Sequence, residues 1–279
     1  IEVDVPTGEP TRRPIDMQRK PYRFLEMPAV KLIDDEGKSL PVQLISIRET
    51  ERLVTSPTQL PKAQPVQRLK MAFQSEQGPF ELANYRVSLA SAEKRAGAYG
   101  EDLVTSPTEI ENEYLRLNLS ENGSLWLTSK ITNKTIGPIH VLEDGGDIGD
   151  TYHYDQPQMD SIITKSSADH YALVERGPLS GAFHLRYHLS VPEKADAERL
   201  GRSHELTTLV IDVVARVKRG CPYLAFDIAV DNSALDHRLR VIFPSGVHSE
   251  VATSSSQLDT VTREIAIPDA WVGAATTQP

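Results

Sequence analysis

The sequence has almost no cysteine and no long apolar run. Cys221 is the single cysteine, so no disulfide can form within the chain, and this favours a reducing, intracellular setting. No apolar stretch approaches the ~20 residues that a helix needs to cross a bilayer. The start shows no basic segment followed by an apolar one, the mark of a signal peptide. We therefore expect a cytoplasmic protein without a membrane partner.

Positive charge is also in deficit. The 279 residues include 30 Lys and Arg against 39 Asp and Glu, which gives a net charge of −9. This balance argues against nucleic acid or an anionic membrane surface as a partner. The chain is 25% charged and 39% hydrophobic, the composition of a globular protein. Its length suits one large β domain or two domains of ordinary size.

Several signatures of catalysis are missing. The chain has no G-x-S-x-G nucleophile elbow and no glycine-rich phosphate loop. Cys221 lies at the start of an expected strand and is best interpreted as a small packed residue. His184 and His188 have the spacing of a helical zinc site, but the alternation around them predicts a strand. On a strand these two positions lie roughly 13 Å apart, so we expect no metal site there.

The sequence does contain apolar residues that alternate with polar ones, the pattern of half-buried strands. In 183–191 the apolar side chains share one face and His184, Arg186 and His188 share the other, and 113–120 alternates in the same way. Further strands are expected at 29–33, 39–49, 68–73, 84–90, 124–130, 208–220, 223–231 and 238–244. Segment 193–202 is the best helix candidate, although it could be a polar loop. The pattern predicts a mainly β protein of antiparallel strands and long loops.

Turns and connections follow from glycine, proline and aspartate. The residues around Gly37 have the chemistry of a tight turn between two strands. The hexapeptide LVTSPT occurs at 53–58 and at 103–108. Its flanks differ, so we interpret the copies as two similar strand-exit turns rather than a duplication. Segment 91–110 is polar and suits a linker.

The most unusual stretch is EDGGDIGDTYHYDQP at 143–157, where three aspartates alternate with glycines. Counted from Asp144, acidic residues fall at positions 1, 4, 7 and 12 of the loop. This spacing does not match the EF-hand calcium loop, which needs ligands at 1, 3, 5, 7, 9 and 12. His153 and Asp155 form a His-x-Asp unit that lacks further ligands nearby in the sequence. The spacing thus gives little support to a metal loop.

The same stretch has the side chains of a sugar site. Carboxylates accept hydrogen bonds from sugar hydroxyls, and aromatic rings cover the apolar face of a sugar ring. Asp147, Asp150, Tyr152 and Tyr154 provide both kinds of group within eight residues. A solvated turn with its tyrosines packed against the sheet explains these residues equally well. The residues alone leave both interpretations open.

Three stretches together resemble a known family. They are ENEYLRLNLSENGSLWLTSKITN (111–133), LEDGGDIGDTYHYDQP (142–157) and DNSALDHRLRVIFPSGV (231–247). They resemble the C-terminal β region of glycoside hydrolase family 38, the α-mannosidases, and in particular its bacterial mannosylglycerate-hydrolase-like branch. All three stretches occur in the family's order, and the resemblance extends weakly over the first half of the chain.

The resemblance implies a fold. We expect an extended lead-in at 1–28, a small β-sandwich domain at 29–107, and a galactose-mutarotase-like antiparallel β-supersandwich at 108–279 that is truncated. It also implies a retaining, metal-dependent exo-α-mannosidase. In the family the aspartate nucleophile and the zinc ligands lie in an N-terminal barrel that this chain lacks. Zinc or another divalent metal is therefore expected in that barrel, and no catalytic or metal residue is carried over to this chain.

The resemblance implies a site as well. The family's β region folds against the barrel, so an α-mannoside and the barrel of the same polypeptide are the expected partners, and homo-oligomerisation is left open. Asp147, Asp150, Tyr152 and Tyr154 are then expected to contact the substrate or the barrel rim. For the trio 236–238 (Asp, His, Arg) we favour a structural network that orders the loops. The fragment alone is expected to be inactive.

Two other functions compete with this one. The chain could be a free-standing carbohydrate-binding module. It could also be an aldose-1-epimerase-like enzyme on the same supersandwich, which would need a histidine acid and a carboxylate base in one cleft. His184 or His188 with Asp212 or Asp227 could be nominated, but no spacing recommends them.

Overall fold

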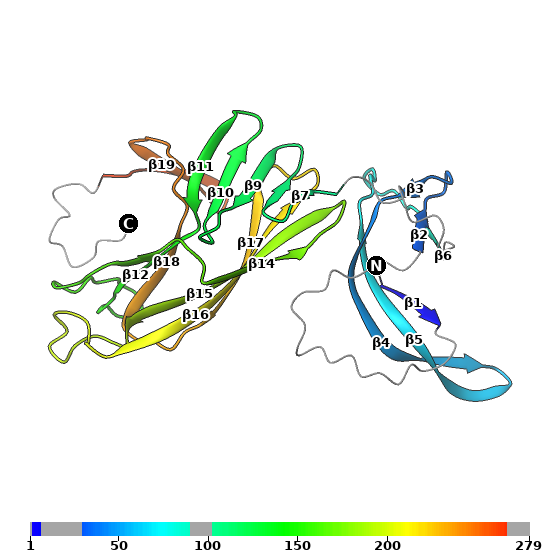
Figure 1. The fold of residues 1–279 in the computed structure, drawn as a ribbon, viewed down its shortest axis with the longest axis horizontal. Coiled ribbons are helices and arrows are strands. Elements are labelled where there is room, and N and C mark those ends of the chain that lie inside the picture. The colour runs from blue at the N-terminus through cyan, green and yellow to red at the C-terminus, as the bar shows by residue number, and fades with distance from the viewer. Residues whose placement is uncertain (1, 7–29, 90–101, 267–279) are drawn as a thin grey trace. The chain divides into compact units, whose positions relative to one another are not determined.

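The computed structural model describes residues 2–6, 30–89 and 102–266 (Figure 1). The regular secondary structure of these residues is all β, which confirms the prediction of a mainly β protein. Among these residues the structure has no helical segment that could serve as a membrane span. The strands are β1 (Glu2–Pro6), β2 (Val30–Ile33), β3 (Ser39–Leu40), β4 (Val42–Ser56), β5 (Gln59–Phe73), β6 (Arg86–Leu89), β7 (Val104–Ser106), β8 (Glu109–Glu111), β9 (Leu115–Leu119), β10 (Leu125–Ser129), β11 (Lys134–Ile139), β12 (Val141–Gly146), β13 (Ile163–Lys165), β14 (His170–Glu175), β15 (Ser180–Pro192), β16 (Leu206–Lys218), β17 (Leu224–Asp231), β18 (His237–Ile242), β19 (Val251–Ser256) and β20 (Asp259–Glu264).

These strands form six sheets. Their orders are β1-β5-β4, β3-β2-β6, β11-β10-β9-β8-β7, β13-β12-β18, β14-β15-β16-β17 and β19-β20. The long hairpin β4–β5 is antiparallel, as are β12 with β13 and β12 with β18. Strand β12 therefore has a neighbour on each side, and residues 147–157, which we call the acidic loop, begin at its end.

The chain divides into two compact units. The first takes in the described residues within Ile1–Arg116, Ala172–His184 and Val214–Phe226, and the second those within Leu117–Tyr171, Leu185–Val213 and Asp227–Pro279. The predicted domains 29–107 and 108–279 stay predictions. Most of the predicted lead-in lies outside the described residues, and its residues 2–6 form β1 beside β5.

The first unit has a small apolar core that is formed by side chains of β2, β4 and β5. Leu32, Val42, Leu69 and Met71 are each at most 2% exposed and pack together. The predicted turn before β3 is confirmed, because Asp34 Oδ1 accepts the backbone N–H of Lys38 at 2.8 Å. Burial of these four apolar side chains contributes on the order of 2 kcal/mol each to this unit.

Alternation builds the core of the second unit, as the sequence predicts. In β15 the side chains Leu185, Tyr187, Leu189 and Val191 are at most 2% exposed, while the residues between them face solvent. Strand β9 buries Leu115, Leu117 and Leu119 in the same way. One buried face per strand is what an antiparallel sheet with one solvated side requires.

Both LVTSPT copies form hairpin turns. The first ends β4 and leads into β5, and the second ends β7 and leads into β8, with a turn at the proline each time. The interpretation as strand-exit turns is therefore confirmed. The linker predicted at 91–110 is wrong in its second half, because β7 and β8 pair there and Ile110 is fully buried.

The helix candidate at 193–202 is wrong, and the alternative of a loop holds. Arg199 has a φ of 55°, which a right-handed helix does not allow. The Leu200 N–H donates to Asp196 Oδ1 at 3.0 Å, and Ala195 forms an antiparallel bridge with Arg202. The segment turns back on itself instead, and this delivers the Arg202 side chain to the interior.

A buried ionic network holds the base of the acidic loop in the second unit. Asp144 lies in β12 and its side chain is 0% exposed. Arg202 Nη1 donates to Asp144 Oδ2 at 2.5 Å, and Arg202 Nε donates to Asp160 Oδ1 at 2.8 Å. His237 Nδ1 lies 2.5 Å from Asp144 Oδ1. Asp144 is therefore a structural acid and not part of an exposed acidic face.

His237 also contacts Asn232. Its Nε2 lies 3.0 Å from Asn232 Oδ1, and the backbone N–H of Ala234 donates to that same oxygen. The side chains of Asp144, Asp160, Arg202 and His237 are at most 6% exposed, and the Arg202 guanidinium between the two carboxylates makes their burial tolerable.

Removing one partner from this network should be costly. We expect Arg202→Met to lower the free energy of unfolding by roughly 3–5 kcal/mol, because Asp144 and Asp160 would stay buried without their cation. Arg186→Met is the matched control, since Arg186 pairs with Asp212 at the surface, where loss of such a pair costs ~0–1 kcal/mol. Urea unfolding at neutral pH measures both, and equal losses would contradict the assignment.

His140 is a second buried ionisable group in this unit. It follows β11, is 0% exposed, and its ring lies 5.6 Å from the Tyr187 ring and 6.0 Å from the Phe243 ring, centroid to centroid. Burial disfavours the charged form and lowers the pKa of His140 from 6.5 to about 4. The native protein therefore holds this ring neutral.

This lowered pKa predicts a loss of stability in acid. The stabilisation is complete above pH 6.5, where the unfolded chain is also neutral, and it is lost as the pH falls towards about 4. The loss is on the order of 3 kcal/mol. We expect His140→Phe to flatten the dependence of the urea midpoint on pH between 6.5 and 4.5. Exposed His204→Phe should leave that dependence unchanged, and an equal effect of both variants would refute the prediction.

Candidate functional site

The acidic loop closes on its own aspartates. Asp147 follows β12, and its backbone N–H donates to the carbonyl oxygen of Asp236 at 2.9 Å. Its Oδ1 accepts the N–H of Gly149 at 3.0 Å and of Asp155 at 3.2 Å. The Ile148 N–H donates to the Asp155 carbonyl at 2.8 Å. One carboxylate oxygen therefore joins the two sides of the loop.

Asp150 organises the tip of the loop in the same way. Its Oδ1 accepts the N–H groups of Tyr152 and His153, both at 2.8 Å, and lies 3.2 Å from His153 Nδ1. The bond from Tyr152 is the largest cause that lowers the pKa of Asp150, followed by the bond from His153. Asp150 is consequently a carboxylate at neutral pH. Its Oδ2 takes no part in these bonds.

The two tyrosines have different surroundings. Tyr152 is 80% exposed at the loop tip. Tyr154 is half-buried, and the guanidinium carbon of Arg238 lies 4.3 Å from the centre of its ring, a cation–π contact. Of the four predicted residues, Asp150 and Tyr152 present themselves to solvent, whereas Asp147 and Tyr154 hold the loop. Contact of any of the four with a substrate stays a prediction.

Glycine is required where the loop narrows. A Cβ atom on Gly149 would lie 1.8 Å from the carbonyl oxygen of His153, and one on Gly146 would lie 2.7 Å from Pro157 Cγ. No side chain can occupy such space without moving the backbone. The glycines of this stretch thus allow two chain segments to approach each other closely.

The trio that follows β17 orders this loop, as we favoured from the sequence. Asp236 has a φ of 48°, and its Oδ2 accepts the Ala195 N–H at 3.2 Å. Its Oδ1 lies 3.6 Å from Arg199. His237 belongs to the buried network, and Arg238 covers Tyr154. All three residues act on the packing of the loop.

Among the other candidates from the sequence, Asp212 and His188 lie in ion pairs. No group of three or more His, Cys, Asp or Glu side chains that could hold a metal occurs among residues 2–6, 30–89 and 102–266. Asp212, nominated for an epimerase, is held by Arg186 through two bonds of 2.8 Å. His188 lies 3.3 Å from Asp169, which also binds Lys165.

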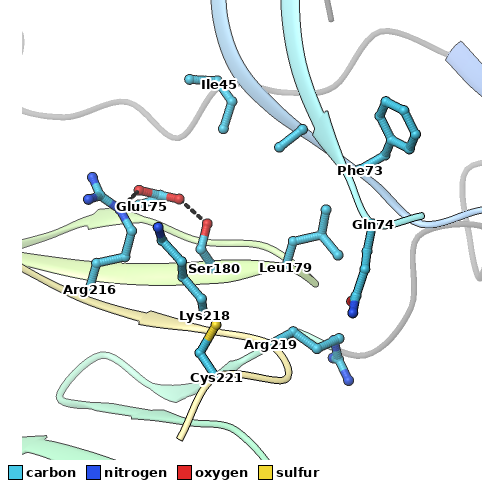
Figure 2. Close-up of a pocket in the computed structure, with 11 residues that line it drawn as sticks. Ile45, Phe73, Gln74, Glu175, Leu179, Ser180, Arg216, Lys218, Arg219 and Cys221 are labelled. Carbon is cyan, nitrogen blue, oxygen red and sulfur yellow. Dashed lines mark hydrogen bonds and ion pairs between the residues drawn. The ribbon is translucent and has the colours of Figure 1, made fainter. Parts of the chain in front are cut away.

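A pocket in the first unit was missed by the sequence analysis (Figure 2). It has a volume of about 520 Å³, and Glu175, Arg216, Lys218 and Arg219 are among its lining residues. Figure 2 shows Arg216 and Lys218 projecting from β16 towards the side where Glu175 lies. The alternation in ARVKRG could have indicated two bases on one face, but nothing local shows which residues form the opposite wall.

Comparison with known proteins adds the family. Residues 110–279 match the glycosyl hydrolases family 38 C-terminal domain. A putative mannosylglycerate hydrolase from Halalkalibacterium halodurans is 28% identical over 174 residues, which make up 56% of this chain and 19% of that protein.

Two solved structures are also similar. An alpha-mannosidase from Enterococcus faecalis V583 has a TM-score of 0.74 and 24% identity, over 98% of this chain and 32% of that one, which shows the fold. A protein in the glycosyl hydrolase family 38 from Enterococcus faecalis has a TM-score of 0.71 and 27% identity, over 95% of this chain and 33% of that one. The chain spans about a third or less of the length of these proteins. Because the family match covers well over half of its residues, the chain belongs to the glycoside hydrolase family 38 C-terminal domain family.

Proposed function

We propose that this chain is the C-terminal β region of a retaining exo-α-mannosidase, and that loop 147–157 forms part of its sugar pocket. Membership of the family supports the first half of the proposal. The observation that carries the second half is the pairing of a fixed carboxylate, Asp150, with an 80% exposed ring, Tyr152, at one loop tip. Binding residues are often carried on loops that a rigid scaffold positions.

The chemistry of the tip suits a sugar. Asp150 Oδ1 is held by backbone N–H groups, so its Oδ2 can accept a hydrogen bond from a sugar hydroxyl. The Tyr152 ring can cover the C–H face of a pyranose. The bonds of Asp147 and the Arg238–Tyr154 contact fix the loop in advance, which lowers the entropy that binding would cost.

Catalysis itself is assigned elsewhere. A retaining hydrolase needs two carboxyl groups ~5 Å apart on either side of the bond that it cleaves. We assign that pair, and the zinc or other divalent metal, to the N-terminal barrel that longer relatives of this kind would provide. The described residues offer no group of three or more His, Cys, Asp or Glu side chains that could hold a metal. The role of this chain is to shape the pocket.

The loop proposal predicts a kinetic effect in the full-length enzyme. We expect Asp150→Ala and Tyr152→Ala each to lower kcat/KM on an aryl α-mannoside by roughly 10-fold, which corresponds to ~1.4 kcal/mol of lost transition-state binding. Phe80→Ala is the control, because Phe80 is a fully exposed aromatic residue outside the loop. Steady-state kinetics measures all three, and unchanged values for both loop variants would rule out the substrate role.

The assignment of catalysis to another domain predicts that the isolated chain is inactive. We expect no hydrolysis of an aryl α-mannoside by residues 1–279 above the buffer rate, with or without added Zn²⁺, while circular dichroism shows a folded β protein. The full-length enzyme under the same conditions is the positive control. Turnover by the isolated chain would show that its own carboxylates catalyse the reaction.

A further inference from the structure

The pocket of the first unit is rich in bases, although the protein as a whole is acidic. Arg216 and Lys218 lie two residues apart on β16, so their side chains leave the same face of the strand, while Ala215 and Val217 are buried on the other. Arg219 follows at the strand end. Three bases and one carboxylate, Glu175, therefore line this pocket in a chain of net charge −9.

The single carboxylate is already neutralised. Glu175 Oε2 accepts Arg216 Nε at 2.9 Å, and Glu175 Oε1 accepts the Gln43 amide at 2.9 Å and the Ser180 hydroxyl. Figure 2 shows Glu175 joined to Arg216 and Ser180 on one side of the pocket. These bonds use Glu175 as a fixed acceptor for its own neighbours, which leaves it poorly placed to neutralise a further cation.

The two remaining bases differ in their surroundings. Lys218 forms no ion pair within the described part of the chain. Arg219 donates from Nε to the Pro178 carbonyl at 2.5 Å and lies 3.3 Å from the exposed Glu113. The Pro178 bond fixes the direction of the guanidinium. The pocket consequently keeps an excess of positive charge, centred on Lys218.

The rest of the lining is apolar or neutral. Ile45, Phe73 and Leu179 provide apolar surface, and Gln74 provides an amide that can both donate and accept. A volume of about 520 Å³ lies within the usual range of small-molecule sites, ~300–1,000 Å³. A ligand with one anionic group and a compact C–H framework would match both parts of the wall.

We propose that this pocket binds a small organic anion, a monosaccharide-sized carboxylate or phosphate ester, whose charge is held by Lys218. Ile45 and Leu179 contact its carbon framework. This site shares no residue with loop 147–157, and it goes beyond the proposed function because it needs no mannoside and no catalytic domain. Charge-assisted bonds from Lys and Arg to such groups are about twice as strong as neutral ones.

Calorimetric titration of residues 1–279 at constant ionic strength tests this proposal. The probes are glucose 6-phosphate, glucuronate and glucose, which share a ring and differ in charge. We expect one or both anions to bind and glucose to bind at least 10-fold more weakly. Preference between the two anions identifies the acidic group. Equal binding of all three probes, or binding of none, overturns the proposal.

Substitutions at Lys218 test whether this residue holds the anion. We expect Lys218→Gln to weaken anion binding by at least 10-fold and Lys218→Arg to retain most of it. Lys134→Gln, at an exposed position of β11, is the matched control and should change binding by less than twofold. An equal loss in Lys218→Gln and Lys134→Gln would show a general effect of surface charge and overturn the assignment. Urea midpoints verify that each variant is folded.

Discussion

The candidate sugar loop depends on the buried carboxylate of Asp144. A lone ionised acid in the interior would cost several kcal/mol, so β12 can bury this residue only when its partners arrive. Arg202 is 58 residues away along the chain and His237 is 93 residues away. The ionic network therefore makes the packing of β12, the turn at 193–202 and β18 conditional on one another. The mutual dependence of these contacts matters more here than the strength of any one of them.

Two layers of interactions follow outwards from this network. The first consists of Asp160, which accepts the Gly146 N–H just before the loop, and Asp236, whose backbone carbonyl accepts the Asp147 N–H at its start. The second consists of Asp147 and Asp150, whose Oδ1 atoms fold the loop onto itself. The buried network thereby restrains the solvent-exposed tip of the loop. A binding surface built in this way loses little entropy when a ligand arrives.

Much of the fold could be predicted from the sequence because its signal is local. Alternation in β9 and β15 and the LVTSPT turns depend on neighbouring residues only. The helix predicted at 193–202 was wrong because Arg202 pairs with Asp144, which is distant in sequence, rather than with residues of its own segment. Asp144 resembled Asp147 and Asp150 in sequence and differed from them by its burial and its partners. The basic pocket was missed for the same reason, since Gln43 and Glu175 are 132 residues apart.

The pocket also shows that the net charge of a protein does not determine the charge at each of its sites. A value of −9 governs the approach of large polyanions, which respond to the summed field of the surface. A small anion inside a pocket responds to charges within about one Debye length, ~8 Å at physiological salt. There the relevant sum is that of Glu175, Arg216, Lys218, Arg219 and its partner Glu113, which is still positive. An acidic protein can therefore repel nucleic acid and still hold a small anion.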